Sequence, residues 1–435
     1  MKKTKFILSL CLCASMVASA AGYKDGIEYF KADQFDNAKD ILLRNIGSIT
    51  PAEKSISYYY LGAIDLRNGD KAAAKANFDN GMAADAKCAY NYVGLGELDL
   101  RNGNVKSAED LFKKAQSFNK KNAEISVMIA RAYYNADPVK YTKEIDKYLN
   151  KARKDSKLQE PSIYIFEGDM LMDQKQVGDA AGKYENAIYY DAGNSEGYVK
   201  YANAYFQVNP DYAVQKLEEL KAKQPTSALA QRELAEKYYE NEQLGRAWKQ
   251  YEKYVENPNH FRRDEQRYAG LLYSAGEYDK SIEWANKVLA QDASVGPMYR
   301  ILALNYTAQK NWPEALKAAE QLFNSGTTIV PNDYNLYGDA LIRNDRGTDA
   351  VAIYEKAIAA NPDDSKFVPK LASAYAAAGN NEKSIEILEK YLNDGNGGLN
   401  DLYSMSNRYA SMAKANLEDD AKRVEYADKA IKYID

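Results

Sequence analysis

Few residues in this chain are of the types that most often carry catalysis. His260 is the one histidine among 435 residues, and it lies in a predicted loop, Asn257-Pro258-Asn259-His260. A zinc enzyme or a metal carrier with several histidine ligands is therefore excluded, and a Ser-His-Asp or Cys-His device could use only this residue. Cys88 lies far from His260 in the sequence. This pair does not indicate a nucleophilic site.

Motifs for phosphate, metal or sugar chemistry are also missing from the sequence. It contains no Walker loop, no His-Glu-x-x-His and no Gly-x-Gly-x-x-Gly run after a predicted strand. Acidic pairs such as Glu218-Glu219 and Asp363-Asp364 are typical of solvated helix faces and loops, whereas a glycosidase needs two carboxylates in a rigid cleft. We therefore predict a protein that is not an enzyme, with no catalytic residues, no metal site and no cofactor.

The charge balance excludes a strongly basic protein that holds nucleic acid through its phosphates. Lys and Arg number 58 and Asp and Glu number 62, which gives a net charge of −4. Hydrophobic residues make up 46% and charged residues 28%, as in a folded protein. Proline is limited to 11 residues, which suits a mostly helical chain. No nucleic-acid partner is expected.

The N-terminus has the pattern of a secretory signal peptide. Lys2, Lys3 and Lys5 precede a mainly apolar run over residues 6–17, and Ala18-Ser19-Ala20 then forms a small-x-small cleavage pattern. We expect residues 1–21 to be this signal, and the chain to be exported. The apolar run is too short to span a bilayer, and no later segment has the length and apolarity of a membrane helix. No transmembrane segment is therefore expected after residue 21.

The rest of the chain repeats itself at intervals of about 34 residues. Ser57–Gly69 aligns with Asn91–Gly103, and the Leu-Gly pair in each places Gly62 and Gly96 at the same position of the pattern. Following the small residue at this position gives a ladder: Gly62, Gly96, Ala130, Gly168, Ala202, Ala235, Ala269, Ala303, Gly338 and Ala372. Asn-Gly and Ala-Gly pairs, as at Asn68-Gly69, predict turns within the repeats.

This pattern resembles the tetratricopeptide repeat family. The best single copy runs through Tyr334, Tyr337-Gly338, Leu341, Ala350, Tyr354, Ala357 and Pro362. The resemblance extends over nearly all of the chain after residue 21. It implies an all-α fold: an α-solenoid of about twelve helix-turn-helix units in a right-handed superhelix, with its concave side lined mostly by the first helix of each unit.

Two departures from the repeat suggest subdivisions. The insertion at residues 136–139 and the Gly-rich loop at 394–398 are read either as hinges or as ordinary loop insertions. We expect N-terminal units over residues 22–157, central units over 158–393 and a divergent C-terminal unit over 394–435.

The resemblance also predicts which residues line the concave groove. In the family these lie three before, one after and four after the small residue. In the central units the positions are filled by aromatic, Arg and Asn side chains, which are typical of binding surfaces. The predicted groove residues are Arg131, Tyr134, Asn203, Phe206, Arg232, Tyr239, Tyr273 and Arg300. Most of the 37 tyrosines, in contrast, fall at packing positions.

These features predict a non-catalytic interaction scaffold that binds a peptide or protein surface in the groove. The family's clamp for chaperone C-termini is absent, since Val199 and Glu233 stand where Lys and Asn are required. Cys11 and Cys13 lie within the expected signal, so Cys88 alone would remain and no internal disulfide is expected. Export without disulfides suggests a partner in the cell envelope, in the periplasm, with attachment to the outer membrane left open. The alternative is a glycan-binding accessory protein for peptidoglycan or an exported polysaccharide, which would show several coplanar exposed rings. The oligomeric state is left open.

Overall fold

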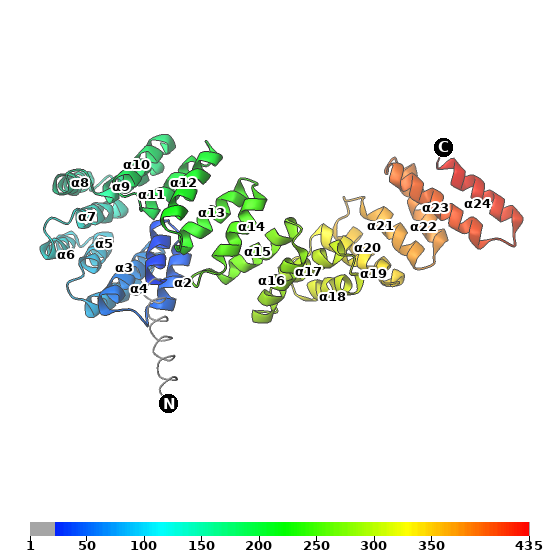
Figure 1. The fold of residues 1–435 in the computed structure, drawn as a ribbon, viewed down its shortest axis with the longest axis horizontal. Helices are drawn as coiled ribbons and strands as arrows, with labels where there is room; N and C mark the ends of the chain where they lie inside the picture. The colour runs from blue at the N-terminus through cyan, green and yellow to red at the C-terminus, as the bar shows by residue number, and fades with distance from the viewer. Residues whose placement is uncertain (1–21, 435) are drawn as a thin grey trace, which may run out of the picture. The chain divides into compact units, whose positions relative to one another are not determined.

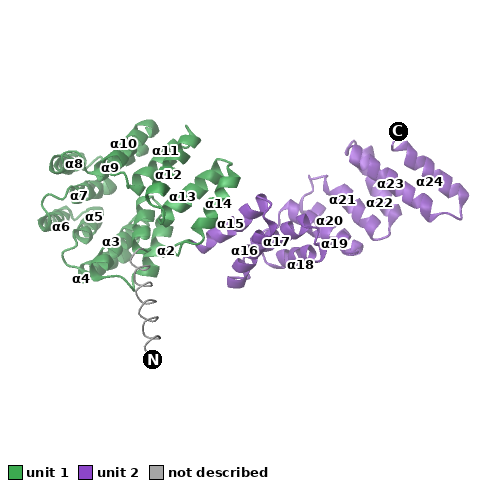
Figure 2. Cartoon of the chain, viewed as in Figure 1, with its two compact units in different colours: residues 1–260 green, residues 261–435 purple. Residues whose placement is uncertain are grey.

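The computed structural model describes residues 22–434, which form paired helices and, within that range, no strand. The chain divides into two compact units, one ending at His260 and one beginning at Phe261 (Figure 2). The signal peptide expected at residues 1–21 lies outside the described residues. The boundaries expected at 157/158 and 393/394 separate groups of repeats rather than compact units, and they stay predictions.

The first unit is a series of antiparallel helix pairs (Figure 1). Its first pair is a helix over residues 22–31 followed by α2 (Phe35–Asn45). Six further pairs follow: α3 (Pro51–Arg67) with α4 (Lys71–Ala84), α5 (Ala89–Arg101) with α6 (Val105–Phe118), α7 (Ala123–Ala136) with α8 (Thr142–Ser156), α9 (Pro161–Asp173) with α10 (Val177–Tyr190), α11 (Ser195–Tyr205) with α12 (Pro210–Lys223), and α13 (Ala228–Glu240) with α14 (Leu244–Tyr254).

The second unit continues the same pattern. Its pairs are α15 (Arg262–Ser274) with α16 (Tyr278–Gln291), α17 (Gly296–Ala308) with α18 (Trp312–Asn324), α19 (Pro331–Arg343) with α20 (Gly347–Ala360), α21 (Phe367–Ala377) with α22 (Asn381–Asn393), and α23 (Leu399–Ala415) with α24 (Asp420–Lys432). Counted over residues 22–434, the chain has twelve helix pairs, so the predicted all-α solenoid of about twelve units is confirmed. None of the helices in this range is both long and apolar enough to cross a membrane.

Local sequence signals explain where the helices begin and turn. Thr50 and Glu53 form a capping box at the start of α3, and Pro51 occupies its first turn, where no backbone donor is lost. Gly69 adopts a φ of +84° in the turn to α4, a left-handed conformation that glycine takes without strain. Other pairs place a non-glycine residue in this conformation, as at Glu242 with a φ of +55°.

The small residues of the ladder let the two helices of a pair approach closely. A Cβ atom added at Gly62 would lie 2.5 Å from the ring of Phe78, and one added at Gly96 would lie 2.3 Å from Phe112. Both rings are fully buried, so they cannot move aside at little cost. The repeat period therefore encodes this ring-against-backbone packing, and stacking of the pairs buries the remaining apolar faces.

Tyrosines that lie four residues before the small residue of the ladder form hydrogen bonds with the loop that precedes them. The hydroxyl of Tyr92 donates to the carbonyl of Ala86 at 3.0 Å, and the hydroxyl of Tyr164 donates to that of Leu158 at 2.8 Å. Tyr299 makes the same bond to Ala293 at 3.1 Å. In each case the acceptor lies six residues earlier, so the ring packs while the hydroxyl fixes the connection between two pairs.

Candidate functional site

The first helix pair, residues 22–45, contacts helices of the same unit that come much later in the chain. Gln34 Nε2 donates to Glu233 Oε1 at 2.6 Å, and Ser227 Oγ donates to Glu28 Oε2 at 2.7 Å, each across 199 residues. The first unit therefore closes on itself. We call the contact of residues 22–45 with α11, α13 and residues 224–259 the seam.

A cavity of about 390 Å³, here called the central pocket, lies beside the seam on the first helices of successive pairs. It brings together three of the predicted groove residues: Arg131 and Tyr134 from α7, and Asn203 from α11. These positions share the register of the repeat, and therefore lie on one face. Asp33 of the first helix pair completes the lining.

Asp169 on α9 is the centre of an ion network in the central pocket. Its carboxylate lies 2.7 Å from Arg131 Nη1 and 3.0 Å from Lys200 Nζ, and it accepts a hydrogen bond of 2.9 Å from the Tyr184 hydroxyl. Burial opposes ionisation of Asp169, but the charges of Arg131 and Lys200 outweigh burial and hold its pKa below the usual value. Lys200 Nζ also lies 2.5 Å from Asp33 Oδ2. The network therefore joins α7, α9 and α11 to the first helix pair.

Aromatic rings form the other wall of the central pocket. The Arg131 guanidinium lies 4.8 Å from the centroid of the Phe166 ring. Tyr134 meets the same ring edge-on, at 5.5 Å and an interplanar angle of 87°, and its hydroxyl donates to Asp173 at 2.8 Å. The pocket thus combines charges of both signs with apolar ring surface.

The other predicted residues of the first unit lie outside the lining of the central pocket. Phe206 is half-buried just after α11, with Lys237 Nζ 4.7 Å from its ring centroid. Tyr239 on α13 is 43% exposed. Arg232 is only 15% exposed, since its guanidinium lies 3.3 Å from both Glu233 and Glu236 and donates to Gln34 of the first helix pair.

Two predicted residues belong to the second unit. Tyr273 on α15 is half-buried and packs 6.0 Å from Tyr278, measured between ring centroids. Arg300 on α17 forms a two-point pair with Asp333, at 2.7 and 2.8 Å, and also donates to the Thr328 carbonyl. The Asp333 side chain is fully buried, so this pair is built into the contact of α17 with α19.

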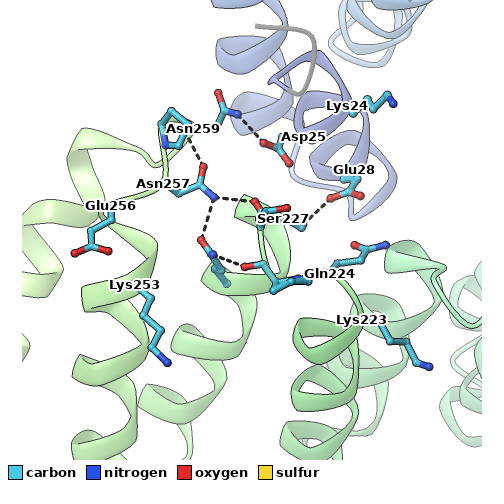
Figure 3. A pocket seen from close by; sticks show the side chains of 14 residues that line it. Lys24, Asp25, Glu28, Lys223, Gln224, Ser227, Lys253, Glu256, Asn257 and Asn259 are labelled. Carbon is cyan, nitrogen blue, oxygen red and sulfur yellow. Dashed lines mark hydrogen bonds between the residues drawn. The ribbon is translucent and has the colours of Figure 1, made fainter. Parts of the chain in front are cut away.

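A second and larger cavity, of about 880 Å³, opens at the seam itself (Figure 3). Asn259 donates to Asp25 and Ser227 donates to Glu28, as the dashed lines show. Burial raises the pKa of Asp25 to about 6 and that of Glu28 to about 7. His260 lies in a loop, as predicted, and is half-buried, with Nδ1 2.6 Å from the Asn257 carbonyl.

Sequence reasoning missed most of the charged residues of the central pocket and the seam. Lys200 lies two residues before the small residue Ala202, and this position is not one of those expected to line the groove. Asp33 lies in a turn. No local pattern links either residue to the other. Among residues 22–434, no group of three or more His, Cys, Asp or Glu side chains is placed to hold a metal ion.

Family models described as tetratricopeptide repeat match residues 61–124 and 341–404. No curated protein matches the chain significantly. Among solved structures, the C-terminal part of a TPR repeat-containing protein from Cytophaga hutchinsonii is 22% identical with a TM-score of 0.41, and the match covers 54% of this chain and 93% of that one. YrrB, titled a TPR protein with an unusual peptide-binding site, is 21% identical with a TM-score of 0.35, over 42% and 91%. MamA is 20% identical with a TM-score of 0.35, over 39% and 98%.

The two family matches lie in different units, one over α3 to α6 and one from α19 to α23. The helices between them are 11 to 15 residues long, and a small residue again faces a ring at Gly168, where an added Cβ would lie 2.5 Å from Tyr184. The chain therefore contains tetratricopeptide repeats, which the family models match over residues 61–124 and 341–404.

Proposed function

We propose that this protein is a non-catalytic scaffold of the cell envelope that binds a peptide segment of a partner protein in the central pocket. Tetratricopeptide repeats support a role in protein–protein interaction. One observation carries the choice of site: Arg131, Tyr134 and Asn203, predicted independently from the repeat register, line one cavity of about 390 Å³.

The chemistry of the pocket suits a peptide. Arg131, Asp169 and Lys200 present both signs of charge, and the half-buried Tyr134, packed on the buried Phe166, presents ring surface for an apolar side chain. Rigid helix pairs hold these groups in place, so little conformational entropy is lost when a ligand binds. The peptide is favoured over the glycan alternative because Phe166 is fully buried and meets Tyr134 at 87°, so these two rings do not form a coplanar exposed pair.

The envelope location rests on the pattern of residues 1–21 and is tested separately. We expect the full-length chain to be cleaved after Ala20 or Ala21 and recovered with the periplasm or the outer membrane. Cell fractionation with N-terminal sequencing of the purified protein measures both. An uncleaved chain in the cytoplasmic fraction would remove the envelope from the proposal and leave the scaffold role.

The binding site is tested by filling the central pocket. Asn203 is exposed, so Asn203→Trp should block the pocket without disturbing the core. Asn150→Trp on α8, also exposed and outside the lining, is the matched control. Mild cross-linking of native envelope, affinity capture and quantitative mass spectrometry should yield a stoichiometric protein with the wild type and with the control.

The pocket variant should lose that protein. If Asn203→Trp retains it, the partner binds elsewhere on the repeats. If no protein is captured and purified cell-wall polymer binds instead, the glycan alternative replaces the peptide.

A further inference from the structure

The first helix pair has two faces of opposite character. Toward α3 it is apolar: Tyr23 and Leu42 share one core cluster with Tyr60 and Leu61. Toward the seam it is polar, and its contacts are side-chain hydrogen bonds and ion pairs, from Asp25, Glu28, Asp33 and Gln34. The pair is therefore anchored by an apolar cluster on one side, whereas on the other side polar contacts surround a single large buried ring, that of Tyr29 beside Tyr254.

The polar side is also loosely packed. Four cavities of the described part of the chain include residues of the first helix pair in their lining, with volumes of about 880, 390, 210 and 110 Å³. These clefts are partly open to solvent, so the polar contacts of the seam lie beside water. Polar contacts around open cavities stabilise a contact less than buried apolar area does, so the seam can open while the pair stays attached to α3.

Asp33 is the point at which the seam reaches the central pocket. Its carboxylate lies against the ammonium of Lys200, which is 9% exposed, while the Asp33 side chain is 59% exposed. With Asp33 in place, the lining holds three acidic and three basic side chains: Asp33, Asp169, Asp173, Arg67, Arg131 and Lys200. Without Asp33 the lining has one excess positive charge, and the buried Lys200 keeps Asp169 at ion-pair distance, with the charge of Glu196 farther away.

We propose that Asp33 occupies the place of an acidic side chain of the partner, so that the central pocket binds acidic peptides by exchanging Asp33 for a carboxylate of the ligand on Lys200. The first helix pair then acts as an internal competitor that sets the affinity of the pocket. This inference rests on the proposed peptide-binding function and names the ligand class and the regulation of that site.

The test removes the competitor without removing the pocket. Asp33→Asn removes the negative charge that contacts Lys200. Asp36→Asn removes an exposed negative charge of the first helix pair that lies outside the cavity linings. Each variant, comprising residues 22–435, is immobilised and exposed to three random peptide pools. The pools are identical except at one set of positions, which holds Glu in the first pool, Gln in the second and Lys in the third. Retained peptide is measured by mass spectrometry.

We expect Asp33→Asn to retain the Glu pool at least about fivefold more strongly than the wild type and Asp36→Asn do. Lys200→Gln added to Asp33→Asn should abolish this gain, with circular dichroism showing that the helices are intact. Equal retention of the Glu pool by the wild type and Asp33→Asn would overturn the inference, as would equal retention of the Glu and Gln pools.

Failure of the inference and failure of the proposed function give different results. If a pool is retained without regard to Asp33 but is lost on Asn203→Trp, the pocket binds peptides and only the exchange is wrong. If no pool is retained by any variant, both the peptide-binding function and the exchange are overturned.

Discussion

Asn259 donates a hydrogen bond of 2.6 Å to Asp25, which lies 234 residues earlier in the chain. Both side chains are buried, and Glu28 accepts a similar bond from Ser227 one helical turn away. The first unit is thus held closed by carboxyl groups that have been removed from water. Since a buried carboxyl group resists ionisation, we expect closure of the seam to depend on pH.

We expect the first unit to lose stability as the pH rises from 5 to 8. Folding raises the pKa of Asp25 from 3.8 to about 6 and that of Glu28 from 4.5 to about 7. The folded state therefore binds protons that the unfolded state releases. The resulting stabilisation is complete below pH 4 and is lost as the pH passes through 6 and 7. It amounts to something on the order of 2–3 kcal/mol for each carboxyl group.

Melting temperature against pH measures this effect for the wild type and for Asp25→Asn/Glu28→Gln. The variant keeps the hydrogen-bond acceptors but cannot ionise, so its curve should stay above that of the wild type at pH 8. Other charged groups lie around the two carboxyls and are common to both proteins: Lys24, Lys31, Lys223, Lys253 and Glu256. Parallel curves would show that Asp25 and Glu28 do not titrate in this range.

Gly338→Ala should destabilise α19 and α20 by about 1–3 kcal/mol. A Cβ at this position would lie 2.4 Å from the ring of Tyr354, which is fully buried and hydrogen bonded to Asp339. Gly182→Ala in α10 is the matched control, because a Cβ there meets nothing within 4 Å and alanine favours the helix by roughly 0.5–1 kcal/mol. Amide hydrogen exchange of each helix pair reports the two effects, and equal effects at both sites would contradict the close packing.

Arg300→Ala should destabilise the contact of α17 with α19 by about 3 kcal/mol. The substitution leaves the Asp333 carboxylate buried without its cation, which costs more than the pair itself contributes. Arg346→Ala removes a guanidinium that also pairs with carboxylates, at Glu320 and Asp349, but at an exposed site, and should change little. Thermal melting separates the two cases. Unchanged melting of Arg300→Ala would return this residue to the candidates for partner binding.

Substitution by Ala should destabilise the protein more at Arg232 than at Tyr239, although the repeat register predicts that both residues line the groove. Arg232→Ala leaves Glu233 and Glu236 poorly compensated at the seam and should cost about 3 kcal/mol. Tyr239→Ala removes a ring that is 43% exposed and should stay within about 1 kcal/mol. Chemical unfolding of the two single variants tests this order, and a greater loss for Tyr239→Ala would reverse the assignment.

The repeat sequence predicts contacts within one helix pair and contacts between residues at equivalent positions of different pairs. Gly62 and Gly338 mark the close contact of two helices because each small residue faces a ring sixteen positions later in its own pair, at Phe78 and Tyr354. Arg131 and Asn203 lie in one pocket because they hold equivalent positions in different pairs. Periodicity is enough for these relationships, since stacking repeats the same geometry.

The closure of the first unit has no such period. Asp33 and Lys200 are 167 residues apart, and their meeting depends on the summed curvature of the intervening pairs rather than on any local pattern. For the same reason the register could not show that Arg232 meets Gln34 of the first helix pair.

The seam also sets an order of folding. Contacts between neighbouring pairs join residues close in sequence, so they form quickly and can begin anywhere along the array. The bond from Asn259 to Asp25 has to await every pair between them. During synthesis the first helix pair emerges earliest and reaches its final partners only after residue 259 has been made. Closure is therefore the last folding event of the first unit, and a chain arrested before α13 would display the polar face of residues 22–34 to water.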